Sequence, residues 1–97
     1  MTEPASSVVD RRLAPAADVH TRMFDGEMVL VDLKSGDYYG LNELGARLWD
    51  GILAGKTPRE IATSLEGSYA VEAPRLLADL VALADDLVAR RLLVVSA

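Results

Sequence analysis

The chain has 97 residues, of which 51% are hydrophobic and 26% charged, and these values are typical of one folded domain. Its formal net charge of −5 repels phosphate groups, which argues against a nucleic-acid partner. The absence of cysteine excludes disulfides and thiolate chemistry. No apolar run is long enough to cross a bilayer, and the N-terminus lacks the features of a secretory signal. We therefore expect a cytoplasmic protein that does not contact membranes.

The first segment, residues 1–16, shows no hydrophobic period. It contains serine, proline and alanine together with a charged cluster at 10–12. Such composition at a chain end is typical of a flexible lead-in. We therefore expect one folded domain over residues 17–97.

Three strands are predicted between residues 19 and 41. The segments 19–24 and 27–33 flank Asp25-Gly26, which is a strong hairpin signal. A second turn, supplied with positive φ by its glycine, leads into a third strand over 38–41. In that strand Tyr39 and Leu41 share one face, which we expect to be directed toward the core, while Tyr38 and Gly40 share the other. As the last strand of a small antiparallel sheet, it is expected at an edge with unpaired backbone groups.

Three helices are predicted after these strands. Asn42 is a candidate N-cap for a helix over 43–54. Thr57-Pro58-Arg59-Glu60 is a capping box with proline at the first helical position, and it begins a short second helix. The third helix is predicted over 71–92, followed by an extended tail at 93–95. The order indicates an α+β fold in which a three-stranded antiparallel sheet precedes three helices.

The third predicted helix has an apolar stripe about 160° wide, more than packing on one side requires. One edge of the stripe carries Leu77, Val81 and Val88. The other edge carries four leucines, and it is bordered by charged side chains: Leu76, Leu80, Leu83 and Leu87, with Asp79, Asp86 and Arg90. We expect one edge to pack and the other to line a groove with a charged rim. The pattern leaves open which edge is which, and a stripe that is buried throughout fits it equally well.

No catalytic set can be assembled from these side chains. His20, the single histidine, lies on the weakest strand without a nearby partner. Asp85 and Asp86 are adjacent on a helix and point about 100° apart, which argues against an acid pair or a metal site. The serines have no base to activate them, and there is no glycine-rich phosphate loop. We expect no enzymatic activity, no metal and no cofactor.

The residues at these positions resemble the PqqD-like family of peptide-recognition domains, which are called RiPP recognition elements. The resemblance covers about residues 17–95. It is carried by Val19-His20, Asp25-Gly26, Val29-Leu30-Val31-Asp32, Gly36-Asp37-Tyr38-Tyr39-Gly40-Leu41-Asn42, Gly45-Ala46, Trp49, Gly55 and Thr57-Pro58-Arg59-Glu60. Within the family, the Tyr-Tyr-x-Leu-Asn sequence with Trp49 is most similar to the small stand-alone members of lasso peptide biosynthesis.

The resemblance implies a winged-helix-like fold that binds the leader segment of a ribosomally made precursor peptide. In this family the leader adds as an antiparallel strand to the third strand and lies against the third helix. The resemblance further implies that the bound precursor peptide is delivered to a separate leader peptidase and to a macrocyclase. The residues then expected to bind the leader are Tyr38, Tyr39, Gly40 and Leu41 for pairing, Leu76, Leu80 and Leu83 for an apolar pocket, and Asp79 and Asp86 for its rim.

Three alternatives remain open at this level. A PqqD-type peptide chaperone that serves a radical enzyme would share the same pattern. A winged-helix nucleic-acid binder would share the architecture, although the predicted helices carry few arginines and many acidic residues. A structural subunit could form a homodimer through its leucine face or through pairing of two edge strands.

Overall fold

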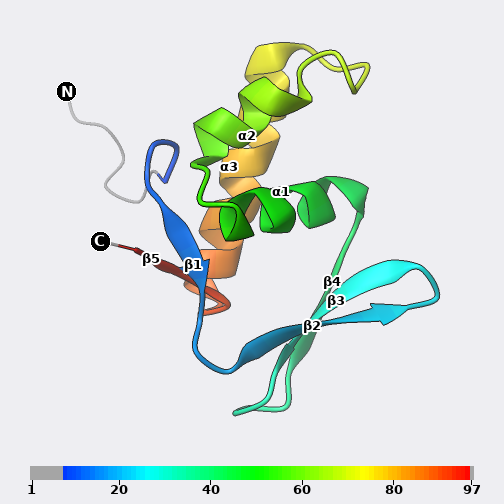
Figure 1. Ribbon diagram of the computed structural model, residues 1–97, viewed down its shortest axis with the longest axis vertical. Helices are drawn as coiled ribbons and strands as arrows, with labels where there is room; N and C mark the ends of the chain where they lie inside the picture. The colour runs from blue at the N-terminus through cyan, green and yellow to red at the C-terminus, as the bar shows by residue number, and fades with distance from the viewer. Residues whose placement is uncertain (1–7, 97) are drawn as a thin grey trace.

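The structure, a computed structural model, describes residues 8–96 (Figure 1). The expected α+β order, with a three-stranded antiparallel sheet before three helices, is confirmed. In the described part of the chain, no helix is long and apolar enough to span a membrane. The elements are β1 (Leu13–Pro15), β2 (Val19–Phe24), β3 (Glu27–Asp32), β4 (Tyr38–Leu41), α1 (Glu43–Leu53), α2 (Pro58–Leu65), α3 (Ala73–Ala89) and β5 (Leu93–Val95).

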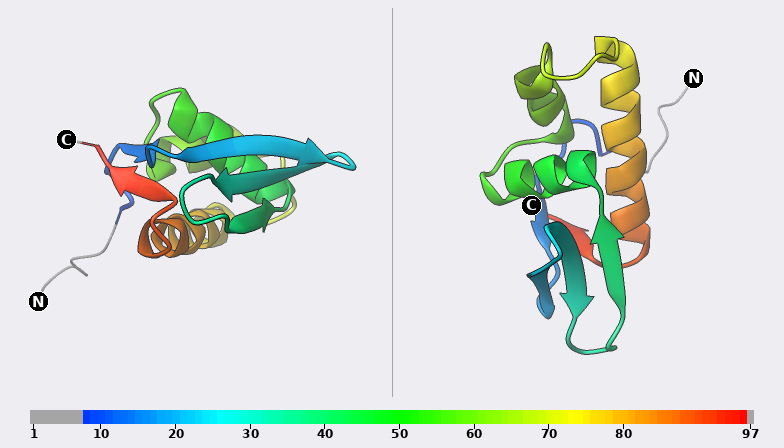
Figure 2. Two further views of the ribbon diagram at one scale, coloured as in Figure 1. Left: turned by 90° about the horizontal axis from the view of Figure 1, so that it is seen from below. Right: turned by 90° about the vertical axis from the view of Figure 1, so that its right-hand side faces the viewer.

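The main sheet has the strand order β2-β3-β4, so β4 lies at an edge as predicted. Asp25 and Gly26 both adopt left-handed backbone angles, with φ of 52° and 81°, as a two-residue hairpin turn of this kind requires. In β3–β4 pairing, Leu30 lies opposite Tyr39 and Met28 opposite Leu41. Both views in Figure 2 show β4 as the strand of this sheet that runs beside α3.

A second, two-stranded sheet joins the two ends of the domain, and its first strand is not predicted from the sequence. β1 pairs antiparallel with β5, with Leu13 opposite Val95. Leu13 is only 4% exposed, and the Arg59 N–H donates to the Val9 carbonyl at 3.0 Å. The expectation of a flexible lead-in is therefore wrong for residues 8–16, and residues 1–7 lie outside the described residues. Local periodicity could not reveal this strand because its partner lies about 80 residues away in the sequence.

The helix starts follow their predicted caps. The Asn42 side chain accepts a hydrogen bond from the Gly45 N–H at 2.8 Å, and α1 begins directly where β4 ends. Thr57 and Glu60 form the reciprocal capping box of α2, with bonds of 2.8 and 3.2 Å. α3 ends near Arg91, whose φ of 64° is left-handed and turns the chain into β5.

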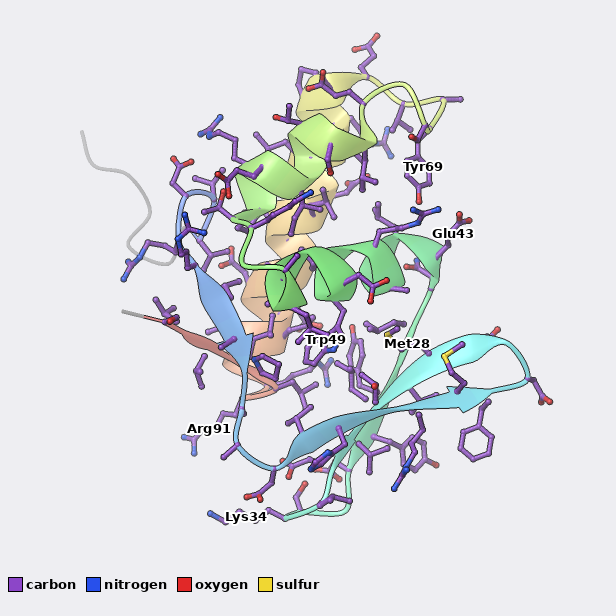
Figure 3. All side chains as sticks on the ribbon, in the orientation of Figure 1. Met28, Lys34, Glu43, Trp49, Tyr69 and Arg91 are labelled. Atoms are coloured by element: carbon purple, nitrogen blue, oxygen red, sulfur yellow. The ribbon has the colours of Figure 1, made fainter. Side chains whose placement is uncertain are left out.

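The core lies between the three helices and the inner face of the main sheet. Trp49 is buried and lies between α1 and the sheet (Figure 3). Leu30 comes from the sheet, and Leu80 and Leu87 come from α3. Burial of such large side chains contributes about 1.5–3 kcal/mol each. This core fixes α1 and α3 against the sheet, and so it fixes what lies beside the edge of β4.

Candidate functional site

The open edge of β4 presents unpaired backbone groups. The Asp32 N–H donates to the Asp37 carbonyl on the β4 side, while the Leu33 N–H donates to Asp18 on the β2 side, both at 2.8 Å. Backbone groups alternate in direction along an antiparallel strand, so Tyr39 and Leu41 bond to β3. The N–H and C=O groups of Tyr38 and Gly40 therefore point to the open edge, where no strand between residues 8 and 96 pairs with them.

β4 and α3 run antiparallel, and their side chains meet in register. Leu41 and Leu83 approach each other over Gly45, where an added Cβ would lie 3.0 Å from Leu41 Cδ2 and 3.3 Å from Leu83 Cδ2. Two residues back along β4, the Tyr39 hydroxyl donates to Asp86 Oδ2 at 3.0 Å. Asp86 follows Leu83 by one helical turn, so the two contacts lie side by side.

A cavity of about 380 Å³ opens between β4, the start of α1, and α3. Its lining includes several of the residues expected to bind a ligand: Tyr39, Gly40, Leu41, Asp79 and Leu83. Asn42 and Leu44 also line it. The sequence predicts Asn42 only as a helix cap, and it predicts no ligand contact for Leu44. Their place in the cavity follows from the direct passage of β4 into α1. The cavity thus joins an open strand edge to apolar walls with a carboxylate at its rim.

Two of the predicted pocket leucines are not accessible. Leu76 and Leu80 are 2% and 0% exposed and belong to the core, so the expectation that they line the pocket is corrected. Their side of α3 is covered by the packing of α1 and α2, which the helix pattern by itself could not reveal. Leu83 is half-buried and is the member of the expected leucine set that reaches the cavity. The leucine edge of α3 is therefore mainly core.

Tyr38 lies on the other face of β4 and does not line this cavity. Its side chain is 78% exposed, and with Phe24, Val29 and Val31 it borders an apolar hollow of about 500 Å³ on the outer face of the sheet. Only the backbone groups of Tyr38 face the open edge. Its expected role is therefore confined to backbone pairing.

The two predicted rim carboxylates differ in their surroundings. Asp79 is exposed and its Oδ2 lies 3.8 Å from the Arg75 guanidinium, a distance typical of a weak surface pair. Asp86 Oδ2 instead accepts hydrogen bonds from the Arg90 Nε and the Tyr39 hydroxyl, each at 3.0 Å. These two bonds, with that from Arg90 the stronger influence, lower the pKa of Asp86, while the bond to Asp86 raises the pKa of Tyr39. Asp86 is thus engaged within the fold, whereas Asp79 is available at the rim.

The fold and this strand-edge groove define a small α+β binding domain, and the chain belongs to the PqqD family. Residues 27–93 match the sequence model of the family described as coenzyme PQQ synthesis protein D (PqqD). The fold is similar to a structure described as a lasso peptide synthetase B1 complexed with the leader peptide. That similarity has a TM-score of 0.80 at 28% identity, over 86% of this chain and 98% of the other.

A second solved structure, TbiB1 in complex with the TbiA(beta) leader peptide, is also similar to this chain. The TM-score is 0.73 at 33% identity, and the match covers 81% of this chain and 92% of the other. Among curated proteins, none matches this chain. The resemblance stated from the residues, to PqqD-like domains and to lasso peptide B1 proteins, is thereby confirmed.

Proposed function

We propose that this chain is a non-catalytic recognition element for the leader segment of a ribosomally synthesised precursor peptide in lasso peptide biosynthesis. The leader adds as an antiparallel strand to the open edge of β4 and lies against α3. The observation that carries the proposal is the unpaired edge of Tyr38 and Gly40 beside a cavity lined by Leu83. Two similar structures described as leader-peptide complexes support it.

Strand addition divides the work between backbone and side chains. The N–H and C=O groups of the edge supply affinity that does not depend on the leader sequence. The cavity supplies selectivity, because Leu41, Leu44 and Leu83 favour an apolar leader side chain. At the rim, Asp79 favours a polar or basic leader group.

We further propose that the module presents the bound leader to a separate leader peptidase and to a macrocyclase. The leader would occupy one edge of the sheet and one side of α3. The outer face of the sheet, which includes the exposed side chain of Phe24, would remain free for such partners. Its apolar character fits a protein partner.

A PqqD-type chaperone for a radical enzyme is the second candidate function, and the description of the matching family favours it. Both functions use the same edge and groove, so they differ in the precursor that is bound. A homodimer formed by pairing two β4 edges would compete with the leader. The fraction of leader bound would then rise less steeply with protein concentration than a one-site curve predicts, because part of the protein would be held as dimer.

The test compares two substitutions at Gly40. Gly40→Pro removes a donor from the open edge without cutting the β3–β4 ladder, because this N–H points away from β3. Gly40→Ala keeps the donor, and its Cβ would meet nothing within 4 Å, so it is the matched control. The probe is a fluorescein-labelled leader peptide encoded by the precursor gene beside the gene of this chain, followed by fluorescence anisotropy.

We expect saturable binding of the leader to the wild-type chain and to Gly40→Ala. Gly40→Pro should bind at least about fivefold more weakly, the value of one lost hydrogen bond, while its circular dichroism spectrum is unchanged. Labelled core peptide and duplex DNA should not bind. Leader binding that is equal in both variants would exclude pairing at this edge. No leader binding at tens of micromolar wild-type protein would refute the function.

A further inference from the structure

Three side chains fasten β4 to α3, and we call them the clasp: Tyr39, Asp86 and Arg90. The Tyr39 hydroxyl and the Arg90 Nε both donate to Asp86 Oδ2 at 3.0 Å. The Arg90 guanidinium carbon also lies 4.9 Å from the centroid of the Tyr39 ring, which is a cation–π distance. The Tyr39 side chain thus spans the whole gap between the edge strand and the helix.

The clasp separates two cavities beside β4. Tyr39 lines both, while Leu83 lines only the first and Arg90 only the second, which measures about 420 Å³. Within the clasp, the Arg90 side chain therefore faces the second cavity. Tyr39, which lines both cavities, therefore lies at the boundary between them.

The register of strand pairing decides which leader side chain lies beside Leu83 and which lies beside the Tyr39 ring. A residue paired with Leu41 lies about 5 Å from it and points, on the same face, toward Leu83. The residue two positions later in an antiparallel leader pairs with Tyr39. Its side chain must pass the ring that is fixed to α3 by Asp86.

We propose that the clasp sets a size limit on the leader, with Asp86 acting as a positioning residue rather than as a leader contact. The leader residue opposite Leu41 is a large apolar anchor. The residue two positions after it, opposite Tyr39, is small. This inference rests on the proposed function and names the side-chain selectivity of the same groove.

The test measures size selectivity rather than affinity alone. The probes are labelled leader peptides from the precursor gene beside the gene of this chain, in which each residue in turn is replaced by alanine or by tryptophan. For wild-type protein, one position should lose affinity on change to alanine. A peptide with tryptophan at the position two residues later should bind with roughly tenfold lower affinity, because the large side chain overpacks the groove beside Tyr39.

Tyr39→Phe and Asp86→Ala open the clasp, since the first removes the hydroxyl that donates to Asp86 and the second removes the acceptor that Tyr39 and Arg90 share. In both variants the tryptophan penalty should fall to less than about threefold. Asp85→Ala is the matched control, because it removes the neighbouring carboxylate of α3 at a position that lines neither cavity and lies outside the clasp. Its tryptophan penalty should equal that of the wild-type chain. A variant that is merely less stable would weaken all the peptides alike.

The outcomes separate this inference from the function on which it rests. Wild-type protein that binds no leader would overturn both. Wild-type protein that binds the leader but tolerates tryptophan everywhere would overturn the size limit alone. The same holds if clasp variants keep the full tryptophan penalty.

Discussion

Gly51 in α1 lies against Ile61 in α2 so closely that a Cβ on the glycine would come within 2.7 Å of Ile61 Cδ1. Ile61 is 2% exposed, so it has little room to move. The close approach of the two helices therefore requires a residue without a side chain at position 51. This crossing holds α1 in the place from which Leu44 lines the groove.

Gly51→Ala should lower stability even though alanine is the better helix former. The propensity gain is about 1 kcal/mol, whereas overpacking a buried contact costs about 1–3 kcal/mol. A net loss of about 1 kcal/mol corresponds to a fall in Tm of about 4–8 °C for a domain of this size. Thermal unfolding followed by circular dichroism measures it, with Gly40→Ala as the control at an open position. An increase in Tm would show that Ile61 can move aside.

Leu13→Ala should destabilise the domain although residue 13 falls in a segment without a sequence signal. The Leu13 side chain is buried beneath the β1–β5 pair, and removing such a side chain costs about 2–5 kcal/mol. Urea unfolding provides the measurement. Arg11→Ala, at an exposed neighbouring position, should change the free energy of unfolding by less than about 0.5 kcal/mol. Equal stability of the two variants would mean that this segment does not pack in solution.

Substitutions at Leu80 and Leu83 should have different effects, the first on stability and the second on leader binding. Leu80→Ala opens a cavity in the core and should cost about 2–5 kcal/mol, with leader affinity of the remaining folded protein unchanged. Leu83→Asp places a charge in the groove and should abolish leader binding with a smaller loss of Tm. Thermal unfolding measures the Tm, and a fluorescence-anisotropy titration of the same samples measures the leader affinity. If Leu83→Asp unfolds the domain instead, then Leu83 is a core residue.

Tyr39→Ala should impair both folding and binding. The Tyr39 ring is half-buried against the core, and its hydroxyl links β4 to α3. Tyr38→Ala, on the exposed face of the same strand, should leave Tm within about 2 °C because it removes no buried contact. Unfolding curves and leader titrations of both variants test this difference. Comparable losses of stability in the two would contradict the assignment of the faces of β4.

Ionised Asp86 should contribute to stability through its two hydrogen bonds in the clasp. Its folded-state pKa lies below the usual value because Arg90 and Tyr39 stabilise the carboxylate. The contribution is therefore complete above the unfolded pKa of about 4 and is lost as the pH falls through the folded pKa. The difference in unfolding free energy between wild type and Asp86→Asn should be constant from pH 7 to about pH 5 and should shrink below about pH 4. Urea unfolding across this range measures it, and a difference that grows at low pH would contradict the sign.

The hairpin at Asp25-Gly26, the caps at Asn42 and Thr57, and the edge position of β4 could all be predicted from the sequence. Each of these depends on residues within a few positions of one another, where turn chemistry, capping and alternation act. The family resemblance was likewise readable, because the Tyr-Tyr-x-Leu-Asn stretch and Trp49 occupy fixed places in this local pattern.

By contrast, the residues of α3 that line the groove and the pairing of the two ends of the domain could not be predicted, because they depend on how the helices pack. Leu80 and Leu83 are equivalent in a helical pattern, and the packing of α1 and α2 on α3 buries the first and leaves the second at the cavity. The pairing of Leu13 with Val95 and the bond from Tyr39 to Asp86 join residues far apart in the chain. Such contacts depend on the position of whole elements, which no local period encodes.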